Sequence, residues 1–376
     1  MSDIGAVIML GPQGESQAEQ LLHRATQAAA VDLIEALARG GLAPIVLAVA
    51  DAQPLQPQAA YTLDLDAPGA ESFHFGERLA GLVERYPMAA VMYFGAASAP
   101  LLPGAVIGWI CATLRAALHA TPEPRLAITN NLHSSDWVAF TVSKAVIPIL
   151  RQVGRDNSLA WVLQQEGGYQ VIRPVGMRPA WAFDLDTPAD LAIVREHPDC
   201  PPHLRAMCHD ALLDRIPLAS VLDTLARDGS RVALIGRVAP QAWTALNEVT
   251  QCWVRVFAEE RGMVASERLA RGEVRSLLAH LVDLLGPQGF FNELAAMVDA
   301  AIIDSRVLMA AAGHYPLAGE RFFSDLYLVD AIADKWVQAF TQAAAAAPIP
   351  VLLGGHSVVG GGLHVIAELV SARRAG

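Results

Sequence analysis

Short apolar runs alternate with longer amphipathic segments through the first half of the chain. The run at residues 4–10 breaks into Gly11-Pro12-Gln13-Gly14, and an amphipathic segment then extends to Arg39. A continuous apolar run indicates a buried strand of a parallel sheet, and a period of about 3.6 residues indicates a helix. Further strands are predicted at residues 44–50, 61–65, 89–94, 125–129 and 169–174. This alternation predicts an α/β domain with a Rossmann-like sheet between helices.

The pattern changes after the proline-rich stretch at residues 198–202. Long helices with apolar faces are predicted at residues 240–261, 266–285, 291–312 and 324–347. Only two strands are predicted among them, at residues 230–236 and 349–353. We therefore expect an α/β domain over residues 1–197 and a mainly helical domain with one or two strands over residues 198–376.

The segment Phe183–Leu191 places two acidic residues at alternate positions just before a predicted helix. In an extended segment Asp184 and Asp186 point to the same side, and Thr187-Pro188 suits a helix start. Carboxylates at a strand end suit Mg²⁺, which takes oxygen ligands and shares them with a substrate phosphate. Asp184 and Asp186 are thus catalytic candidates, unless they lie in an ordinary solvated turn.

Two further stretches gather polar or flexible residues where predicted strands end. One is the polar segment Asn130–Asp136, which contains Ser134 and Ser135 and offers hydrogen-bonding groups for a ligand. The alternative interpretation is an ordinary turn, in which Asn, Ser and Asp are common because they bond to the backbone. The other is the glycine-rich loop at residues 354–362. Its amides could cradle a phosphate, with side chains from Arg237, His356 and Ser357. The alternative is that its glycines let a helix pack tightly on a strand.

Charged residues also interrupt apolar surroundings in the second half. Asp304 and Arg306 lie within the run at residues 300–309, and Arg321 and Asp325 follow nearby. Buried charges must be paired or must serve a ligand. We expect a structural ion network here, with a catalytic group as the alternative.

Composition narrows the class of protein. The chain of 376 residues is 53% hydrophobic and has a formal net charge of −11, which argues against a general nucleic-acid-binding protein. No apolar run is long enough to span a membrane, and the first residues lack the order of a signal peptide. We expect a cytoplasmic protein.

One group of metal-binding residue types lies near the expected domain boundary. It consists of His197, Cys200, His203, Cys208 and His209. Thiolate and imidazole together are zinc chemistry, but the spacing matches no closed zinc-finger pattern and three prolines interrupt it. A linker is therefore the favoured interpretation.

Residues 4–196 resemble the GT-A-type nucleotidyltransferases, in particular the molybdenum-cofactor and 2-phospholactate guanylyltransferases and the sugar-nucleotide cytidylyltransferases. The first glycine loop, the turn at residues 95–102 and the ending at residues 186–191 carry this resemblance. It implies a nucleoside triphosphate as one partner, a phosphorylated small molecule as the acceptor, and Mg²⁺ held by Asp186. We place the nucleotide at Gly11, Gln13, Gly14, Asn130 and Asn131. Candidates for contact with the acceptor are Ser134, Ser135 and Asp136 of the polar segment, and Arg237, His356 and Ser357 at the glycine-rich loop, which lies outside the residues that the resemblance covers.

The chain departs from that family at two functional positions. Its first loop has no Arg or Lys before Arg24 and carries Glu15, and Ala96 stands where the family has a metal-binding aspartate. Two interpretations follow. The site is rebuilt from other groups such as Asp184 and Asp136, or the fold has lost its chemistry and only binds a nucleotide. The alternative is a scaffold protein, whose apolar helices expected at residues 295–312 and 331–347 would form a homo-oligomer.

Overall fold

The computed structural model describes residues 4–50, 54–66, 73–121 and 124–375, and these residues fall into two compact units. The described residues of unit 1 lie in Met1–Pro12, Thr26–Ala182 and Pro201–Leu204, and those of unit 2 in Gln13–Ala25, Phe183–Cys200 and Arg205–Gly376. This division does not coincide with the single boundary expected near residue 197. The segment that contains Asp184 and Asp186 packs with the C-terminal half of the chain.

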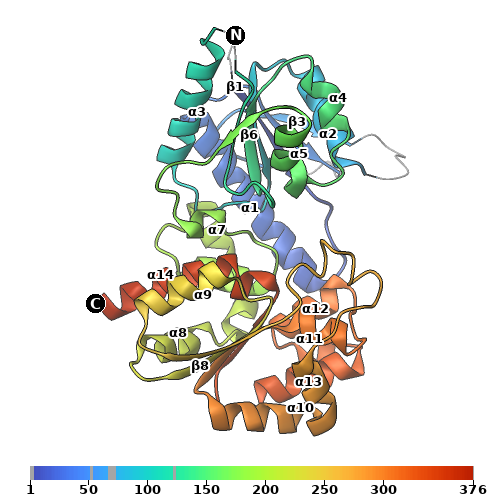
Figure 1. Cartoon of the computed structure of the whole chain (residues 1–376), viewed down its shortest axis with the longest axis vertical. Coiled ribbons are helices and arrows are strands. Elements are labelled where there is room, and N and C mark those ends of the chain that lie inside the picture. Colours follow the sequence, from blue (N-terminus) through green and yellow to red (C-terminus); the bar gives the residue numbers. More distant parts are fainter. Residues whose placement is uncertain (1–3, 51–53, 67–72, 122–123, 376) are drawn as a thin grey trace. The chain divides into compact units, whose positions relative to one another are not determined.

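Unit 1 contains a seven-stranded sheet (Figure 1). Its strands are β1 (Ile4–Leu10), β2 (Ile45–Val49), β3 (Thr62–Leu65), β4 (Ala90–Gly95), β5 (Leu126–Thr129), β6 (Trp137–Thr141) and β7 (Gln170–Ile172). The order across the sheet is β3-β2-β1-β4-β6-β5-β7, and only β6 runs antiparallel to its neighbours. The α/β class is confirmed. The sequence analysis missed β6, because a five-residue apolar run does not by itself distinguish a strand from the start of a helix.

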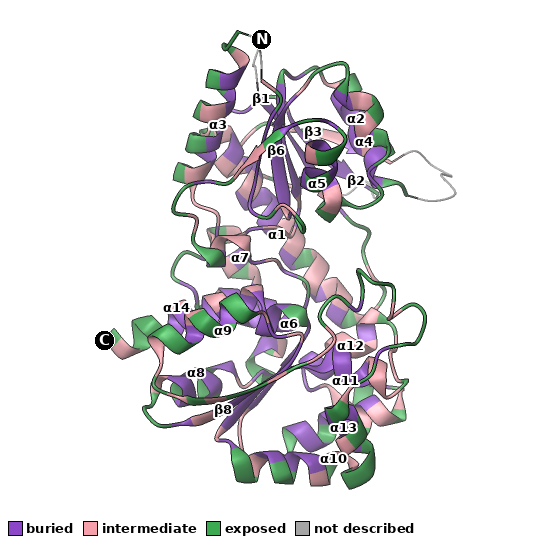
Figure 2. Ribbon diagram, in the orientation of Figure 1, coloured by how far each residue is buried: buried purple, intermediate pink, exposed green. Residues whose placement is uncertain are grey.

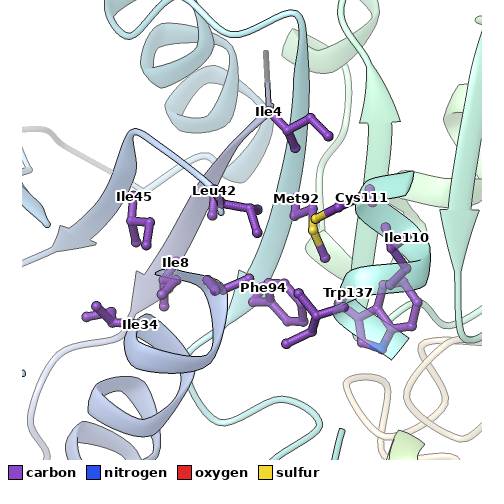
Figure 3. Packing of buried hydrophobic residues seen from close by; sticks show 14 of the residues in the cluster. Ile4, Ile8, Ile34, Leu42, Ile45, Met92, Phe94, Ile110, Cys111 and Trp137 are labelled. Carbon is purple, nitrogen blue, oxygen red and sulfur yellow. The ribbon is translucent and has the colours of Figure 1, made fainter. Parts of the chain in front are cut away.

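Different helices cover the two faces of this sheet. They are α1 (Gln17–Arg39), α2 (Phe75–Arg85), α3 (Gly104–Leu118), α4 (Val146–Arg151) and α5 (Leu159–Gln165), with the short 3-10 helices η1 (Asp156–Ser158) and η2 (Pro179–Ala182). Alternate strand residues such as Ile8 and Phe94 pack on α1 and α3, as Figure 3 shows for Ile34 and Ile110. The residues between them, such as Val7, pack on α2, α4 and α5. This two-sided burial explains why the strands are apolar throughout.

Unit 2 contains a second, four-stranded sheet. Its strands are β8 (Arg231–Gly236), β9 (Trp253–Ala258), β10 (Ala300–Asp304) and β11 (Val351–Gly354), all parallel, in the order β11-β10-β8-β9. The sequence analysis expected only β8 and β11, and assigned the residues of β9 and β10 to long helices. β10 is a fully buried run of five residues, and such runs carry no period that separates a strand from a helix.

Helices surround this second sheet as well. They are α6 (Pro188–Glu196), α7 (Pro202–Met207), α8 (Leu218–Ala226), α9 (Pro240–Val249), α10 (Leu277–Met297), α11 (Ser305–Ala311), α12 (Ala318–Asp325), α13 (Lys335–Ala345) and α14 (Gly361–Ala375), with η3 (Ala211–Arg215), η4 (Val329–Ala331) and η5 (His356–Val359). Residues of α10 and α13 form one core with the sheet, and α8, α9 and α14 lie on its other side in Figure 1. Unit 2 is therefore also a layered α/β structure.

The helix expected to mediate oligomerisation at residues 295–312 does not exist as one element. That stretch contains the end of α10, the buried strand β10 and α11, which lie inside unit 2. Exposed apolar residues occur elsewhere, since the edge strand β9 presents Trp253 with 71% of its surface exposed. Figure 2 shows the contrast between the buried strands and helices such as α3 and α9, which have both buried and exposed residues. No helix of the described residues is both long and apolar enough to traverse a lipid bilayer.

Candidate functional site

The first sheet reverses its strand order between β1 and β4. From β1 the chain builds outward to β2 and β3 on one side, whereas β4 lies on the other side. Ligands of open α/β sheets bind at such a point, outside the carboxyl ends of the strands. Gly11 follows β1 there and is exposed, and a Cβ added to it would meet no atom within 4 Å. The sheet edge is thus open at this residue.

The polar segment Asn130–Asp136 lies at the same edge, because β5 ends there and the antiparallel β6 begins there. Asn130 is buried, donates through its amide group to the Asp136 carboxylate, and accepts from the Asp136 backbone N–H at 3.1 Å. Ser135 is also buried, and its backbone N–H donates to the Asn157 carbonyl at 2.9 Å. Asn130 and Ser135 thus hold the turn, as the alternative interpretation expected. The side chains of Asn131, whose Oδ1 accepts from the His133 N–H at 3.1 Å, and of Ser134 are exposed at the edge.

Gln13 and Gly14 of the first glycine loop belong to unit 2. The loop leads into α1, whose start is capped by its own residues. Ser16 Oγ accepts from the Glu19 N–H at 3.2 Å, and Glu19 Oε2 accepts from the Ser16 N–H at 3.0 Å and from its hydroxyl at 2.6 Å. A carboxylate therefore already occupies the position that a phosphate takes at a helix N-terminus.

The segment around Asp186 forms a similar capping box at the start of α6. Asp190 Oδ2 accepts from the backbone N–H of Asp186 at 3.0 Å, from that of Thr187 at 2.8 Å, and from the Thr187 hydroxyl at 2.9 Å. Asp186 itself is exposed and Asp184 is half-buried. The helix start at Thr187-Pro188 is confirmed. The Thr-x-x-Asp spacing was the available signal for Asp190, which the sequence analysis did not single out.

Asp190 is the most perturbed carboxyl group of this segment. Its side chain is completely buried and its Oδ1 has no hydrogen-bond partner. Burial, and then the nearby charge of Asp186, raise the pKa of Asp190 to about 7, although the Ser357 and Thr187 hydroxyls act to lower it. The group therefore changes its charge near neutral pH.

The second sheet reverses its strand order between β8 and β10, and Arg237 and Asp304 meet at this point. Arg237 Nε donates to Asp304 Oδ2 at 2.5 Å and its Nη2 donates to Asp304 Oδ1 at 3.0 Å. The approach requires glycine at position 236, whose φ is 108°, because an added Cβ would lie 2.6 Å from the Asp304 Cβ. The Asp304 side chain is fully buried, and 13% of the Arg237 side chain is exposed.

The glycine-rich loop at residues 354–362 begins at the same edge, after β11. His356 is exposed there, and partial desolvation followed by the Arg237 charge lowers its pKa. Ser357 Oγ accepts from the Gly362 N–H at 3.2 Å, so this amide is already bonded. A Cβ added to Gly354 would lie 2.3 Å from Val358 and 3.1 Å from Ala189. These contacts favour the tight-packing interpretation of the glycines, while Arg237 and His356 remain candidates for ligand contact.

Metal-binding residue types are dispersed through the structure. His197 Nε2 pairs with Glu368 at 3.1 Å, and His203 Nδ1 pairs with Asp32 at 2.8 Å. Within the described ranges, no group of three or more His, Cys, Asp or Glu side chains is placed to hold a metal ion.

The geometry thus brings the predicted site residues together in two sets. Gly11 and the Asn130–Asp136 segment share the edge of the first sheet in unit 1. Arg237, His356 and Ser357 share the edge of the second sheet, and a Cβ at Gly355 would lie 3.0 Å from Thr187 of the Asp186 segment.

Comparison with known proteins finds distant structural likeness only. No protein-family model matches the chain, and no curated protein sequence matches it. A Desulfovibrio desulfuricans G20 protein assigned as a nucleotide-diphospho-sugar transferase is 12% identical, with a TM-score of 0.38, over 52% of this chain and 87% of that one. CMP:2-keto-3-deoxy-manno-octonic acid synthetase, solved with CTP, is 11% identical, with a TM-score of 0.28, over 46% of this chain and 90% of that one. The likeness assigns no role to any residue of this chain.

Proposed function

We propose that the protein binds a nucleoside triphosphate at the carboxyl edge of the first sheet. The observation that carries the proposal is the reversal of strand order between β1 and β4, where Gly11 leaves the sheet edge open. Asn131 and Ser134 are exposed at the same edge and suit hydrogen bonds to a base or ribose. The capped start of α1 favours contacts to base and ribose over a phosphate cradle at that helix.

Nucleotidyl transfer to a phosphorylated small molecule is the reaction that we propose for this site. An acceptor phosphate oxygen would attack the α-phosphorus, and the bond to the β-phosphate would break. The β- and γ-phosphates would leave together as pyrophosphate. Asp136 is the carboxylate that the first edge offers, half-buried and held by Asn130. Position 96, where the resembled family has a second, metal-binding carboxylate, is alanine in this chain. We therefore expect nucleotide binding to be more robust than turnover.

Substitution of Gly11 by leucine is expected to weaken nucleotide binding at least about tenfold. The added side chain would enter the open space at the sheet edge without meeting neighbouring atoms, so folding should be unaffected. Isothermal titration with ATP, CTP, GTP and UTP, with and without Mg²⁺, measures the effect. Gly108→Leu is the matched control, because Gly108 is exposed on α3 and also has no neighbour within 4 Å of an added Cβ.

The absence of saturable heat with all four triphosphates would refute the nucleotide-binding proposal. The assembly alternative would then stand, and light scattering on the same samples would measure it. Equal affinities for Gly11→Leu and the wild type would refute this location for the site.

Mg²⁺ is the proposed cofactor, with Asp186 as its ligand. The ion supplies charge neutralisation for a polyphosphate and keeps several oxygen ligands. The Asp186 side chain is exposed at the start of α6. Asp186 therefore fits Mg²⁺ as one member of a ligand set whose other oxygens come from outside this segment.

Mg²⁺ is expected to raise the midpoint of thermal unfolding of the wild type but not of Asp186→Ala. Differential scanning fluorimetry measures the shift. Asp214→Ala is the control, because Asp214 is another exposed acidic residue of unit 2, with 69% of its side chain accessible. An identical shift in Asp186→Ala would remove Asp186 as the metal ligand.

A further inference from the structure

Five charged side chains lie close together beyond the carboxyl ends of β8 and β10, and four of them form two ion pairs. Arg237 pairs with Asp304, as described above. Arg306 Nη1 and Nη2 donate to the two oxygens of Asp325 at 2.8 and 2.5 Å. Asp304 and Asp325 are both fully buried. The expected structural ion network is therefore present, although Asp304 pairs with Arg237 and not with a neighbour in sequence.

Arg321 is the fifth charged residue and belongs to neither of these two ion pairs. It lies one helical turn before Asp325 on α12, on the same side of the helix. Its Nη1 donates to the Tyr315 hydroxyl at 2.6 Å, and its Cζ lies 4.4 Å from the centre of the Tyr315 ring. Its Nε is buried without a hydrogen-bond partner. Among the described residues no carboxylate forms an ion pair with Arg321.

An arginine in this environment costs stability in the absence of an anion. Burial and the positive charge of Arg306 lower the pKa of Arg321, and the opposing effects of Tyr315 and of the Asp325 charge do not offset them. A half-buried cation without a counter-charge is unfavourable compared with an apolar side chain of similar volume. Residues that oppose folding in this way are typical of ligand sites, where the ligand supplies the missing charge.

We propose that Arg321 and Tyr315 form a binding site in unit 2 for the oxyanion group of a small molecule. The planar guanidinium suits two parallel hydrogen bonds to a carboxylate or a phosphate. Tyr315 fixes the plane of the guanidinium by its ring and its hydroxyl, so little conformational freedom remains to be lost on binding. The two neighbouring ion pairs are each neutral, and the site therefore has one uncompensated positive charge for the anion.

The test compares anion-dependent stability of the wild type, Arg321→Met and Arg255→Met. Methionine keeps the apolar stem of the side chain and removes the charge. Arg255 is the matched control, because it is an exposed arginine on β9 of the same unit. Thermal unfolding is followed against inorganic phosphate and against malonate, with sodium chloride at equal ionic strength as the reference.

At least one oxyanion should raise the unfolding midpoint of the wild type and of Arg255→Met, and this rise should saturate with anion concentration. Neither oxyanion should raise the unfolding midpoint of Arg321→Met. Without anions the midpoint of Arg321→Met should lie within about 2 °C of the wild type or above it. Arg321→Lys, which keeps the charge without the planar fork, should need at least about fivefold more anion for half of the rise. A response to phosphate alone identifies a phosphate group as the ligand, and a response to malonate alone identifies a carboxylate.

Two results would overturn the proposal. One is that anions raise the unfolding midpoint of Arg321→Met and of the wild type equally, or give no saturable rise in either protein. The other is a midpoint of anion-free Arg321→Met that falls by more than about 6 °C, which would assign Arg321 to the stability of the fold. Because Gly11 lies in the other unit, the nucleotide proposal and this one fail independently.

Discussion

Replacement of Asp325 by asparagine is expected to lower the free energy of unfolding by about 3–5 kcal/mol. Asp325 is fully buried and forms a two-pronged ion pair with Arg306, which is only 3% exposed. Asparagine has nearly the same shape, so no cavity forms, but Arg306 is left as an uncompensated buried charge. Urea denaturation of the purified chain measures the loss.

Asp214→Asn provides the matched control for that measurement. Asp214 pairs with Arg195 at 2.8 Å, but 69% of its side chain is exposed, so its removal should cost less than about 1 kcal/mol. The double substitution Arg306→Met with Asp325→Leu should recover most of the stability, because it removes both charges together. Similar losses for Asp325→Asn and Asp214→Asn would contradict the assignment of a tightly coupled buried pair.

The second large effect concerns Asp190 and appears as a dependence of stability on pH. Burial raises the pKa of Asp190 from 3.8 to about 7 in the folded protein. The folded state therefore binds this proton more tightly than the unfolded state, and the contribution to stability is full below about pH 4 and is lost as pH rises to 7. Relative to Asp190→Asn, the wild type should lose on the order of 3 kcal/mol between pH 5 and pH 8.

Unfolding in urea at a series of pH values, for the wild type and Asp190→Asn, gives this difference directly. Asparagine retains an oxygen for the three hydrogen bonds that Asp190 Oδ2 accepts, and it carries no charge at any of these pH values. The difference between the two curves also removes the titration of histidines such as the half-buried His364, whose pKa is lowered by desolvation. Parallel curves for the two proteins would show that Asp190 remains ionised across this range.

Much of the fold was available from local sequence alone. The apolar runs at β1, β2, β4 and β5 predicted buried strands, because a strand covered on both faces is apolar at every position. The start of α6 at Thr187-Pro188 was likewise predicted, since cap and first-turn preferences involve only neighbouring residues. The residues of β10 were instead assigned to a helix, because a short buried run has no period that distinguishes a strand from a helix.

The candidate sites depended on contacts that local sequence does not encode. The sequence suggested a network among Asp304, Arg306, Arg321 and Asp325, but the structure pairs Asp304 with Arg237, which is 67 positions away. That pairing arises because β8 and β10 are neighbours at the reversal of strand order. Because the sequence analysis did not predict β10 as a strand, it could not place Asp304 next to Arg237.

The sequence by itself determined the α/β class, the positions of most strands and the helix cap at Thr187. Periodicity and capping arise from interactions within a few residues, so they can be recognised in a linear pattern. Only the tertiary structure decided that the Asp186 segment packs with unit 2, that Asp190 is buried, and that Arg321 donates to the Tyr315 hydroxyl and forms no ion pair with a carboxylate of the described residues. Burial and charge pairing depend on which distant segments pack together, and that choice is made by the whole fold.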